Sequence, residues 1–292
     1  MKSSATEDAF WAIALKERSQ KEVALHERSE LAPDMEEALY RQLAKKALRR
    51  KEIIKIANEA EFILFPTVAS DDGLFGSTGG ELWFASKILA TYLFNEKAIF
   101  PDFKIIIELG SGLGLAGLAA ARIWPQAKVL LTDADQAVVH NLQSTIQFNS
   151  LKQNTEAIFF DFTQKEDDSE ILSGAAASLV LAAAIVYTPH LARGLAQYIY
   201  RNAPYRTLVL QRYDRPGFLS TFIPTLLKYS SSLSFRMHKV ICLSVSQQSQ
   251  QTTIPFHLEE WDPDDRFQFH CSRDDDKLVD DSYFVLCDIR RL

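Results

Sequence analysis

The sequence predicts an α/β fold built on a parallel sheet, and three observations support this. Short apolar runs alternate with amphipathic stretches through the middle of the chain, as strands and helices do. These runs are continuous rather than alternating with polar residues, which is typical of strands buried on both faces. A glycine-rich stretch, Glu108–Gly117, follows one run and opens a helical pattern. Such alternation, with right-handed crossovers, gives a parallel sheet covered by helices.

The elements follow in order from these patterns. A short apolar run at 62–68 comes first, then a turn-rich loop and a helix over 81–94. The remaining strands are expected where apolar residues are continuous, and the remaining helices where they recur every three or four positions. The strands are expected over 104–109, 129–132, 157–160, 179–187, 207–210, 235–245 and 283–289. Helices are expected over 115–123, around Val138, Leu142 and Ile146, around Leu191, Leu195 and Ile199, and over 218–227. Pro224 is expected to disturb the last helix, because proline removes a hydrogen-bond donor.

The chain divides by composition into two parts. Residues 1–60 hold 12 Lys/Arg and 11 Asp/Glu among alanines and leucines, without glycine, and predict a helical N-terminal extension. Residues 61–292 form the predicted α/β domain. The basic cluster at 45–51 is either the solvated face of a helix or a nuclear-localisation or nucleic-acid patch. From Glu259 to Asp281, ten acidic residues stand against three basic ones. This segment is either a solvated excursion or an acidic wall that attracts a basic partner.

The overall composition excludes several classes of protein. The 292 residues are 47% hydrophobic with a formal net charge of -6, so the chain is neither disordered nor collagen-like, and nucleic acid is not an expected partner. Three widely spaced cysteines without a C-x-x-C motif exclude a cysteine zinc cluster and favour a reducing compartment. We therefore expect no metal and a cytoplasmic protein, with the nucleus as a second location. The first residues show no signal peptide, and no apolar stretch is long enough to span a bilayer.

The glycine-rich stretch predicts a nucleotide-type cofactor site, and two cofactors compete for it. Gly112, Gly114 and Gly117 match the dinucleotide pattern G-x-G-x-x-G, with Asp133 about 20 residues on. That pattern begins where the strand ends, at Gly110, and counted from there the third glycine would fall on a leucine. The alternative pattern E-x-G-x-G-x-G fits from Glu108 without a shift of register. A third interpretation is a tight structural turn.

The charge of Glu108 is expected to decide between the two cofactors. A carboxylate at the mouth of the loop would repel a pyrophosphate and suit a cationic ligand. S-adenosylmethionine carries a sulfonium and an ammonium and no phosphate, so it is favoured over NAD. Asp133, at the end of the second strand, is expected to accept the ribose hydroxyls, with Asp135 as the better helix cap. Asp161 and Phe162 are expected to hold the adenine, unless Asp161 is an exposed turn residue.

Five motifs in order resemble those of the seven-strand protein-lysine methyltransferases, the methyltransferase-like family. They span roughly residues 75–240 and are 78–83 (TGGELW), 107–115 (IELGSGLGL), 131–133 (LTD), 160–162 (FDF) and 179–187 (LVLAAAIVY). The resemblance implies a doubly wound sheet of seven strands with the last strand antiparallel, and S-adenosylmethionine as the methyl donor. By position it places Trp83 beside the donor's methionine part, although Trp83 could equally be a core aromatic. It also places Ala183 against the donor, with Gly110, Ser111, Gly112 and Gly114 in the donor loop.

One position departs from the family pattern. The fourth-strand motif is usually D-x-x-Y, with the acid aimed at the acceptor nitrogen, and here the tyrosine is Tyr187 but the acid position holds Ala184. Asp214, beyond the fifth strand, is the candidate for a relocated acid. His190 and Tyr213 are expected near the same edge of the sheet.

The first functional hypothesis is therefore a methyltransferase that acts on a lysine side chain of a protein with a basic surface. The second is a module that binds the donor but is catalytically weak or inactive, which Ala184 favours. A NAD-dependent oxidoreductase is a weaker third. The oligomeric state is not indicated by the sequence.

Overall fold

The computed structural model describes most of the chain from residue 51 onward. The described residues are 51–57, 59–66, 78–164, 178–215, 217–229, 231–242, 256–261 and 284–292. All of them belong to one compact unit, residues 47–292. Most of the predicted helical extension, the basic cluster up to residue 50 and the acidic segment beyond residue 261 lie outside the described residues.

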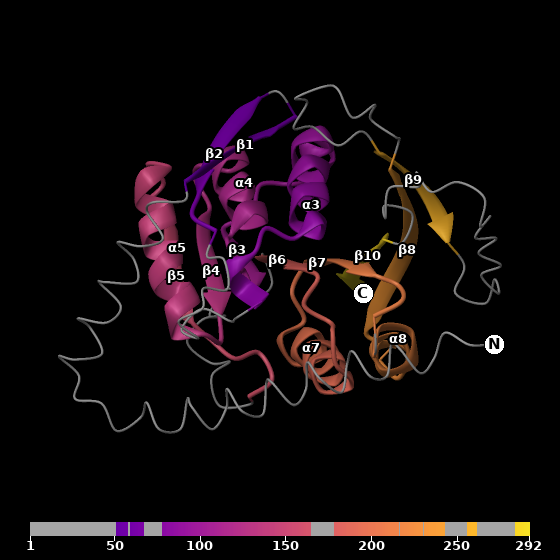
Figure 1. Ribbon diagram of the computed structural model, residues 1–292. Helices are drawn as coiled ribbons and strands as arrows, with labels where there is room; N and C mark the ends of the chain where they lie inside the picture. The colour runs from indigo at the N-terminus through magenta and orange to yellow at the C-terminus, as the bar shows by residue number, and fades with distance from the viewer. Residues whose placement is uncertain are drawn as a thin grey trace, which may run out of the picture. The chain divides into compact units, whose positions relative to one another are not determined.

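The strands and helices follow the predicted order closely (Figure 1). The strands are β1 (Glu52–Ile56), β2 (Ala60–Leu64), β3 (Ile105–Leu109), β4 (Lys128–Asp133), β5 (Thr155–Phe159), β6 (Ser178–Ala183), β7 (Arg206–Arg212), β8 (Leu233–Cys242), β9 (Phe256–Trp261) and β10 (Phe284–Arg291). The helices are α3 (Phe84–Asn95), α4 (Leu115–Ile123), α5 (Gln136–Phe148), α7 (Pro189–Asn202) and α8 (Ile223–Leu227). Short helical turns η2 (Thr78–Gly80), η3 (Lys97–Ile99) and η5 (Phe218–Phe222) complete the list. None of the described helices is both long and apolar enough to cross a membrane.

The main sheet has the strand order β5-β4-β3-β6-β7-β10-β8-β9. The five strands from β5 to β7 pair in parallel, and β10 runs antiparallel between β7 and β8. The α/β class and the antiparallel last strand are confirmed. The expected number of seven strands is wrong for the described residues, because Phe256–Trp261 adds an eighth strand antiparallel to β8. This strand was missed because its exposed residues His257, Glu259 and Glu260 make it resemble the polar segment around it.

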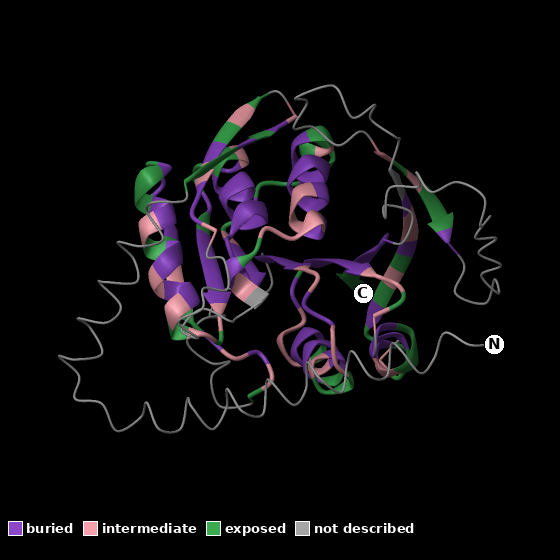
Figure 2. Cartoon of the chain, viewed as in Figure 1, coloured by how far each residue is buried: buried purple, intermediate pink, exposed green. Residues whose placement is uncertain are grey.

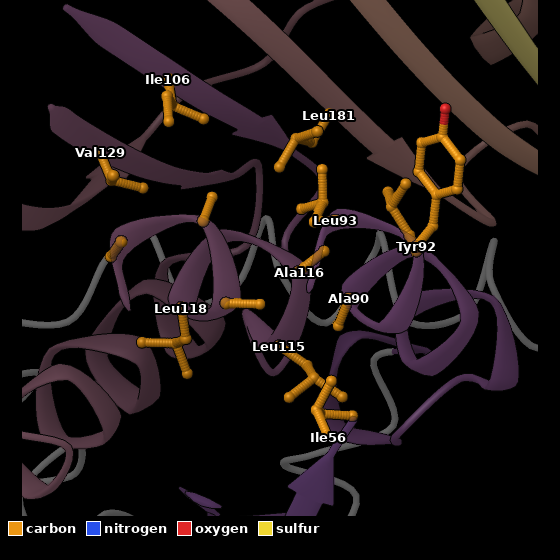
Figure 3. Packing of buried hydrophobic residues seen from close by; sticks show 14 of the residues in the cluster. Ile56, Ala90, Tyr92, Leu93, Ile106, Leu115, Ala116, Leu118, Val129 and Leu181 are labelled. Carbon is orange, nitrogen blue, oxygen red and sulfur yellow. The ribbon is translucent and has the colours of Figure 1, made fainter. Parts of the chain in front are cut away.

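Helices cover both faces of the sheet, so the predicted double winding is confirmed. Neighbouring residues of one strand point to opposite faces. Ile106 of β3 packs with α3, α4 and α5, whereas Ile107 packs with α7, η5 and α8. In Figure 1, α3 and α4 lie above the sheet and α7 and α8 below it. Figure 2 shows the central strands β3, β4, β6, β7 and β10 buried along most of their length. Figure 3 shows Ile106, Val129 and Leu181 of three strands facing α3 and α4.

A separate hairpin of β1 and β2 is fastened to α5. The Asn149 side chain, just after α5, accepts a hydrogen bond from Ile63 N (2.9 Å) and donates one to Ile63 O (2.7 Å). This amide therefore makes the two hydrogen bonds with the Ile63 backbone that a residue of a neighbouring strand would make. Glu52–Ile56 is a strand and not part of a helix, and its hairpin crosses the boundary expected at residue 60.

Two further elements differ from expectation at their ends. β6 ends at Ala183 rather than at Tyr187, because Ala184 has a left-handed backbone with φ 58° that turns the chain. The predicted helix 218–227 is a π-helical turn, η5, followed by the short helix α8 with Pro224 in its first turn. Proline has no N–H to offer there, so the predicted disturbance at Pro224 is confirmed.

Candidate functional site

The carboxyl ends of β3 and β6 lie side by side at the centre of the sheet. From β3 the chain crosses by α4 to β4 on one side, while β6 continues by α7 to β7 on the other. Such a reversal of strand order leaves a crevice above the strand ends, where α/β sheets bind their ligands. The predicted site residues after β3, β4, β5, β6 and β7 therefore meet at one edge.

The loop Gly110–Gly114 joins β3 to α4 and uses left-handed backbone. Gly110, Gly112 and Gly114 have φ of 56°, 53° and 77°, values that only glycine adopts without strain. A Cβ at Gly112 would lie 3.1 Å from the carbonyl oxygen of Gly79, so η2 passes directly over the loop. The missing side chain leaves room for the Gly79 backbone to pack against the loop.

Ser111 and Thr132 hold the loop to the sheet. Ser111 Oγ donates to Glu108 O (3.0 Å) and accepts from Thr132 N (2.9 Å), while Ser111 N donates to Thr132 O (2.8 Å). Thr132 Oγ1 also donates to Glu108 O (2.8 Å). The Ser111 side chain is thus occupied by this clamp, and its role is to position the loop between β3 and β4.

The structure corrects the prediction for Glu108. Its side chain is only 1% exposed and does not line the mouth of the loop. Instead, Oε2 accepts a hydrogen bond from Gly117 N (2.9 Å) in the first turn of α4. Gly117 has to be glycine, because a Cβ there would lie 2.2 Å from Leu131 Cδ2 and 2.7 Å from Glu108 Oε2. Glu108 is therefore a buried support for the start of α4.

The electrostatic argument for the cofactor changes with this correction. Burial raises the pKa of Glu108 to about 8, even though the Gly117 amide favours the charged form. Near neutral pH the carboxyl is mostly protonated, so it does not repel a pyrophosphate. The register of the glycines still distinguishes the two cofactors.

Replacing Glu108 by glutamine is expected to make the protein's stability less dependent on pH. The folded pKa of about 8 exceeds the unfolded value of 4.5, so Glu108 stabilises the fold fully below the unfolded value and loses that contribution as pH rises toward 8. Glutamine is neutral throughout and can still accept from Gly117. Urea unfolding should find Glu108→Gln more stable than the unmodified chain at about pH 8, by about 1–3 kcal/mol, and equal to it at about pH 5. The matched control is Glu52→Gln, at an exposed position of β1. If the free energy of unfolding changes equally with pH in the unmodified chain and in both variants, Glu108 is not the buried group that we describe.

Asp133 sits where a ribose-binding acid is expected. Its Oδ2 accepts from Gly112 N (3.1 Å) and its Oδ1 from Asp135 N (3.1 Å). Burial raises its pKa to about 6, so it is largely ionised at neutral pH. Each oxygen keeps a second lone pair for a ligand hydroxyl. The expected cap is confirmed, because Asp135 Oδ1 accepts from Ala137 N (2.8 Å) at the start of α5.

The predicted adenine pair, Asp161 and Phe162, follows β5 and makes contacts within the protein. The Asp161 carboxylate accepts from Thr163 N (2.9 Å) and Thr163 Oγ1 (2.7 Å), so it closes the turn after β5. Phe162 is 7% exposed and packs in the cluster under α7, which leaves little of its ring face for a purine. Asp161 thus closes a turn and Phe162 packs in the core, and their role in holding an adenine stays a prediction.

The residues after β6 and β7 meet at the expected edge. Ala183 is the partly exposed last residue of β6, and Ala184 N donates to Leu210 O of β7 (2.9 Å). The partly buried Tyr187 follows, and exposed His190 lies in the first turn of α7. The partly exposed Tyr213 follows β7.

The Asp214 carboxylate forms an ion pair with Arg212. Its two oxygens accept from Arg212 Nε (2.9 Å) and Arg212 Nη2 (2.6 Å). A bidentate pair with a guanidinium occupies both oxygens. The role of Asp214 as a replacement acid stays a prediction.

Sequence reasoning missed four residues at this edge. Gln211 is buried, and its Oε1 accepts from Val186 N (3.0 Å), which holds the loop after β6. Gly79 lies over the glycine loop, and the Arg215 guanidinium lies 5.8 Å from the centre of the Trp83 ring. The fourth is Arg212. For Gln211, Arg212 and Arg215 the available signal was the polar run 211–215 (QRYDR), which directly follows the last apolar residue of a buried strand, whereas Gly79 lies in the motif 78–83.

A metal centre is not indicated here. Among the residues described, there is no group of three His, Cys, Asp or Glu side chains that could hold a metal ion.

Comparison with known proteins agrees with this geometry. A family model described as "lysine methyltransferase" matches residues 67–217, more than half of the chain. The human protein-lysine N-methyltransferase EEF2KMT is 28% identical over 146 residues, 45% of this chain and 42% of that protein. An Arabidopsis thaliana calmodulin-lysine N-methyltransferase is 35% identical over 69 residues, 24% of this chain and 22% of that protein. The chain thus matches less than half the length of these relatives.

Among solved structures, TrmK of M. capricolum with S-adenosylhomocysteine is similar, with a TM-score of 0.44 and 10% identity over 72% of this chain and 69% of that one. Because this TM-score is below 0.5, the family assignment rests on the match between the sequence and the family model. That match includes the glycine loop, the acid after β4 and the loop after β6. On this evidence the chain belongs to the lysine methyltransferase family.

Proposed function

We propose that this chain is a methyltransferase that uses S-adenosylmethionine to methylate a lysine side chain of a protein. One observation supports the proposal most directly. The glycine loop and Asp133 are hydrogen-bonded to each other where the strand order of the sheet reverses, in a chain that belongs to the lysine methyltransferase family. Relatives that are named for methylating protein lysines support a protein acceptor.

The residues present fit this donor. Gly112 N donates to Asp133 Oδ2 (3.1 Å), so the glycine loop and this carboxylate lie together at the strand ends. Asp133 offers carboxylate lone pairs that ribose hydroxyls can bond. When bound, the donor supplies a methyl group on a positively charged sulfur, which a neutral amine can attack directly.

The protein's own contribution is positioning. Asp133 and the loop hold one reactant, while Ala183 and Tyr187 border the place where the second must approach. Fixing two reactants in line converts a bimolecular step into an effectively unimolecular one, and no covalent intermediate with the protein is required. A lysine must lose its proton before it attacks, and Ala184 supplies no acceptor for it. We expect solvent or the acceptor protein to take this proton.

The acceptor is proposed to be a basic protein surface. The exposed acids Glu259 and Glu260 on β9 support this, as does the acidic composition of the segment that follows. We propose the cytoplasm, and secondarily the nucleus, as its location.

The first test is equilibrium binding together with methyl transfer. Calorimetric titration should show binding of S-adenosylhomocysteine and no binding of NAD. Incubation with radiolabelled donor and cell-extract proteins should label a protein band. Binding of NAD alone would overturn the proposal in favour of an oxidoreductase. Donor-product binding without any labelling would favour the second candidate, a non-catalytic module.

The backbone at Ala184 allows a sharper test of these two candidates. Alanine is strained at φ 58°, whereas aspartate tolerates the left-handed region better. Ala184→Asp should therefore fold normally and raise the rate of methyl transfer by about 10- to 100-fold, because it restores a hydrogen-bond acceptor for the attacking amine. The matched control is Ala203→Asp, at another left-handed alanine (φ 39°) after α7, which should leave the rate unchanged. Activity that appears only in Ala184→Asp would identify the natural chain as the inactive module.

A further inference from the structure

The loop 184–188 joins β6 to α7 and packs against the glycine loop. A Cβ at Gly110 would lie 2.7 Å from Ile185 Cγ2, so the Ile185 side chain lies directly on the backbone of Gly110. Ala184 opens the loop with left-handed backbone at φ 58°, a conformation that costs alanine free energy. The predicted site residue Tyr187 follows in the same loop, so its position depends on how firmly these few residues are held.

A buried side chain fastens this loop to β7. Gln211 is 1% exposed, and its Oε1 accepts a hydrogen bond from Val186 N (3.0 Å). Because a backbone N–H can only donate, the oxygen of the amide must face Val186 and Nε2 must point elsewhere. The bond therefore fixes the peptide group between Ile185 and Val186, which lies between the contact with the glycine loop and Tyr187.

The Nε2 group of Gln211 is buried and has no hydrogen-bond partner among the residues that the structure describes. A buried N–H group without a partner lowers the stability of a fold. With methionine at this position, Nε2 would be absent and Val186 N would lose its partner instead. Each chain would then bury an unpaired N–H group, so the two should be similar in stability. What glutamine adds over an apolar side chain is the fixed position of the loop.

We propose that Gln211 is a positioning residue for methyl transfer, which fixes the loop 184–188 and hence Tyr187 beside the glycine loop. This inference rests on the proposed function, because it assigns a role within that reaction. The glycine loop has its own bond to β4, from Ser111 N to Thr132 O (2.8 Å), and does not depend on Gln211 to hold the donor. Loss of the Gln211 bond should therefore displace the side from which the acceptor approaches. A displacement of about 1 Å can lower a rate by about 100-fold.

Two substitutions in the full chain test the assignment. Gln211→Met removes the acceptor for Val186 N, whereas Gln211→Glu keeps an oxygen there whether or not its carboxyl is ionised. Gln211→Met should transfer radiolabelled methyl to cell-extract proteins about 10- to 100-fold more slowly, and should change the affinity for S-adenosylhomocysteine by less than about threefold. Gln211→Glu should recover most of the rate. Hydrogen exchange at the Val186 amide should become faster in Gln211→Met and stay slow in Gln211→Glu.

Thr207→Val is the matched control, on the same strand. Thr207 is also buried, and its Oγ1 also has no hydrogen-bond partner within the described part of the chain. It lies about 13 Å from Gln211 along β7 and points to the same face of the sheet. Thr207→Val should change neither the rate of methyl transfer nor hydrogen exchange at Val186.

The outcomes separate this inference from the proposed function. If Gln211→Met keeps the full rate, or if Gln211→Glu is slowed equally, the inference is overturned and the proposed function stands. Unchanged exchange at Val186 in Gln211→Met would also overturn it. The same holds if affinity for S-adenosylhomocysteine falls as much as the rate, because Gln211 would then only support the fold. If the unmodified chain labels no protein, the proposed function itself fails, and this inference fails with it.

Discussion

Asp133→Ala is expected to weaken binding of S-adenosylhomocysteine by about 100-fold or more. The substitution removes the acceptor proposed for two ribose hydroxyls, and hydrogen bonds to a charged group contribute about 1.5–3 kcal/mol each. It also leaves Gly112 N and Asp135 N without their carboxylate partner, so the glycine loop loses a bond that fixes its position. Calorimetric titration of the purified full chain measures the change, and methyl transfer should fall in parallel.

Asp135→Ala is the matched control for this prediction. It removes a carboxylate only two residues away, but one that caps α5 through Ala137 N. Loss of such a cap costs about 1 kcal/mol of stability and should leave ligand affinity nearly unchanged. If the two variants lose equal affinity, Asp133 does not contact the ligand and the donor site is misassigned.

Arg206→Met is expected to lower the free energy of unfolding by about 3–5 kcal/mol. Arg206, 3% exposed at the start of β7, donates to both oxygens of Asp288 on β10, at 2.8 Å and 2.9 Å. Its guanidinium also lies 4.2 Å from the centre of the Phe100 ring. Removing it leaves a carboxylate that is 6% exposed without its main partner. The loss is measured by urea or thermal unfolding.

Arg290→Met is the matched control, because Arg290 binds the same carboxylate from a half-exposed position. Its Nη2 donates to Asp288 Oδ2 at 2.8 Å, and its side chain is 46% exposed. An exposed partner contributes about 1 kcal/mol or less. Equal losses in both variants would contradict a special role for the buried arginine. The double variant Arg206→Met with Asp288→Leu should recover much of the stability, because no buried unpaired charge remains and the half-exposed Arg290 can be solvated.

The ion pair of Arg206 and Asp288 also predicts that the protein loses stability at acidic pH. Burial alone would raise the pKa of Asp288, but hydrogen bonds from Arg290 and Arg206 outweigh it and hold the pKa below 3.8. The contribution of a depressed carboxyl is complete above its unfolded value and disappears as pH falls through the folded value. In Arg206→Met this loss should begin at a higher pH, because the pKa of Asp288 moves upward.

Several features of the fold follow from local pattern alone. The helix over 115–123 was predicted with the observed bounds, because alanine and leucine favour helix and Gly114 precedes it. The cap at Asp135 and the disturbance at Pro224 follow from backbone hydrogen bonding within a few residues. Continuous apolar runs predicted the central strands, because strands of a parallel sheet are buried on both faces.

Other features depend on contacts between residues far apart in the chain. The eighth strand exists because β8 offers a free edge, and its own sequence is polar enough to resemble a loop. Hairpin β1–β2 is held by an asparagine 86 residues from its partner, which no local pattern indicates. β6 ends early because Ala184 adopts a left-handed backbone that is not an intrinsic preference of alanine.

The candidate site divides in the same way. The sequence by itself determined that a glycine loop, an acid at the next strand and a missing acid at Ala184 share one edge, since strand order and chain direction follow from the pattern. Only the tertiary structure decided what each carboxyl and cation does there. Glu108 is buried and largely protonated, Asp133 is partly buried and largely ionised, Asp214 is paired, and Arg215 lies near Trp83. The charge and reach of an ionisable side chain depend on burial and on partners from other strands, and those are set only when the chain is folded.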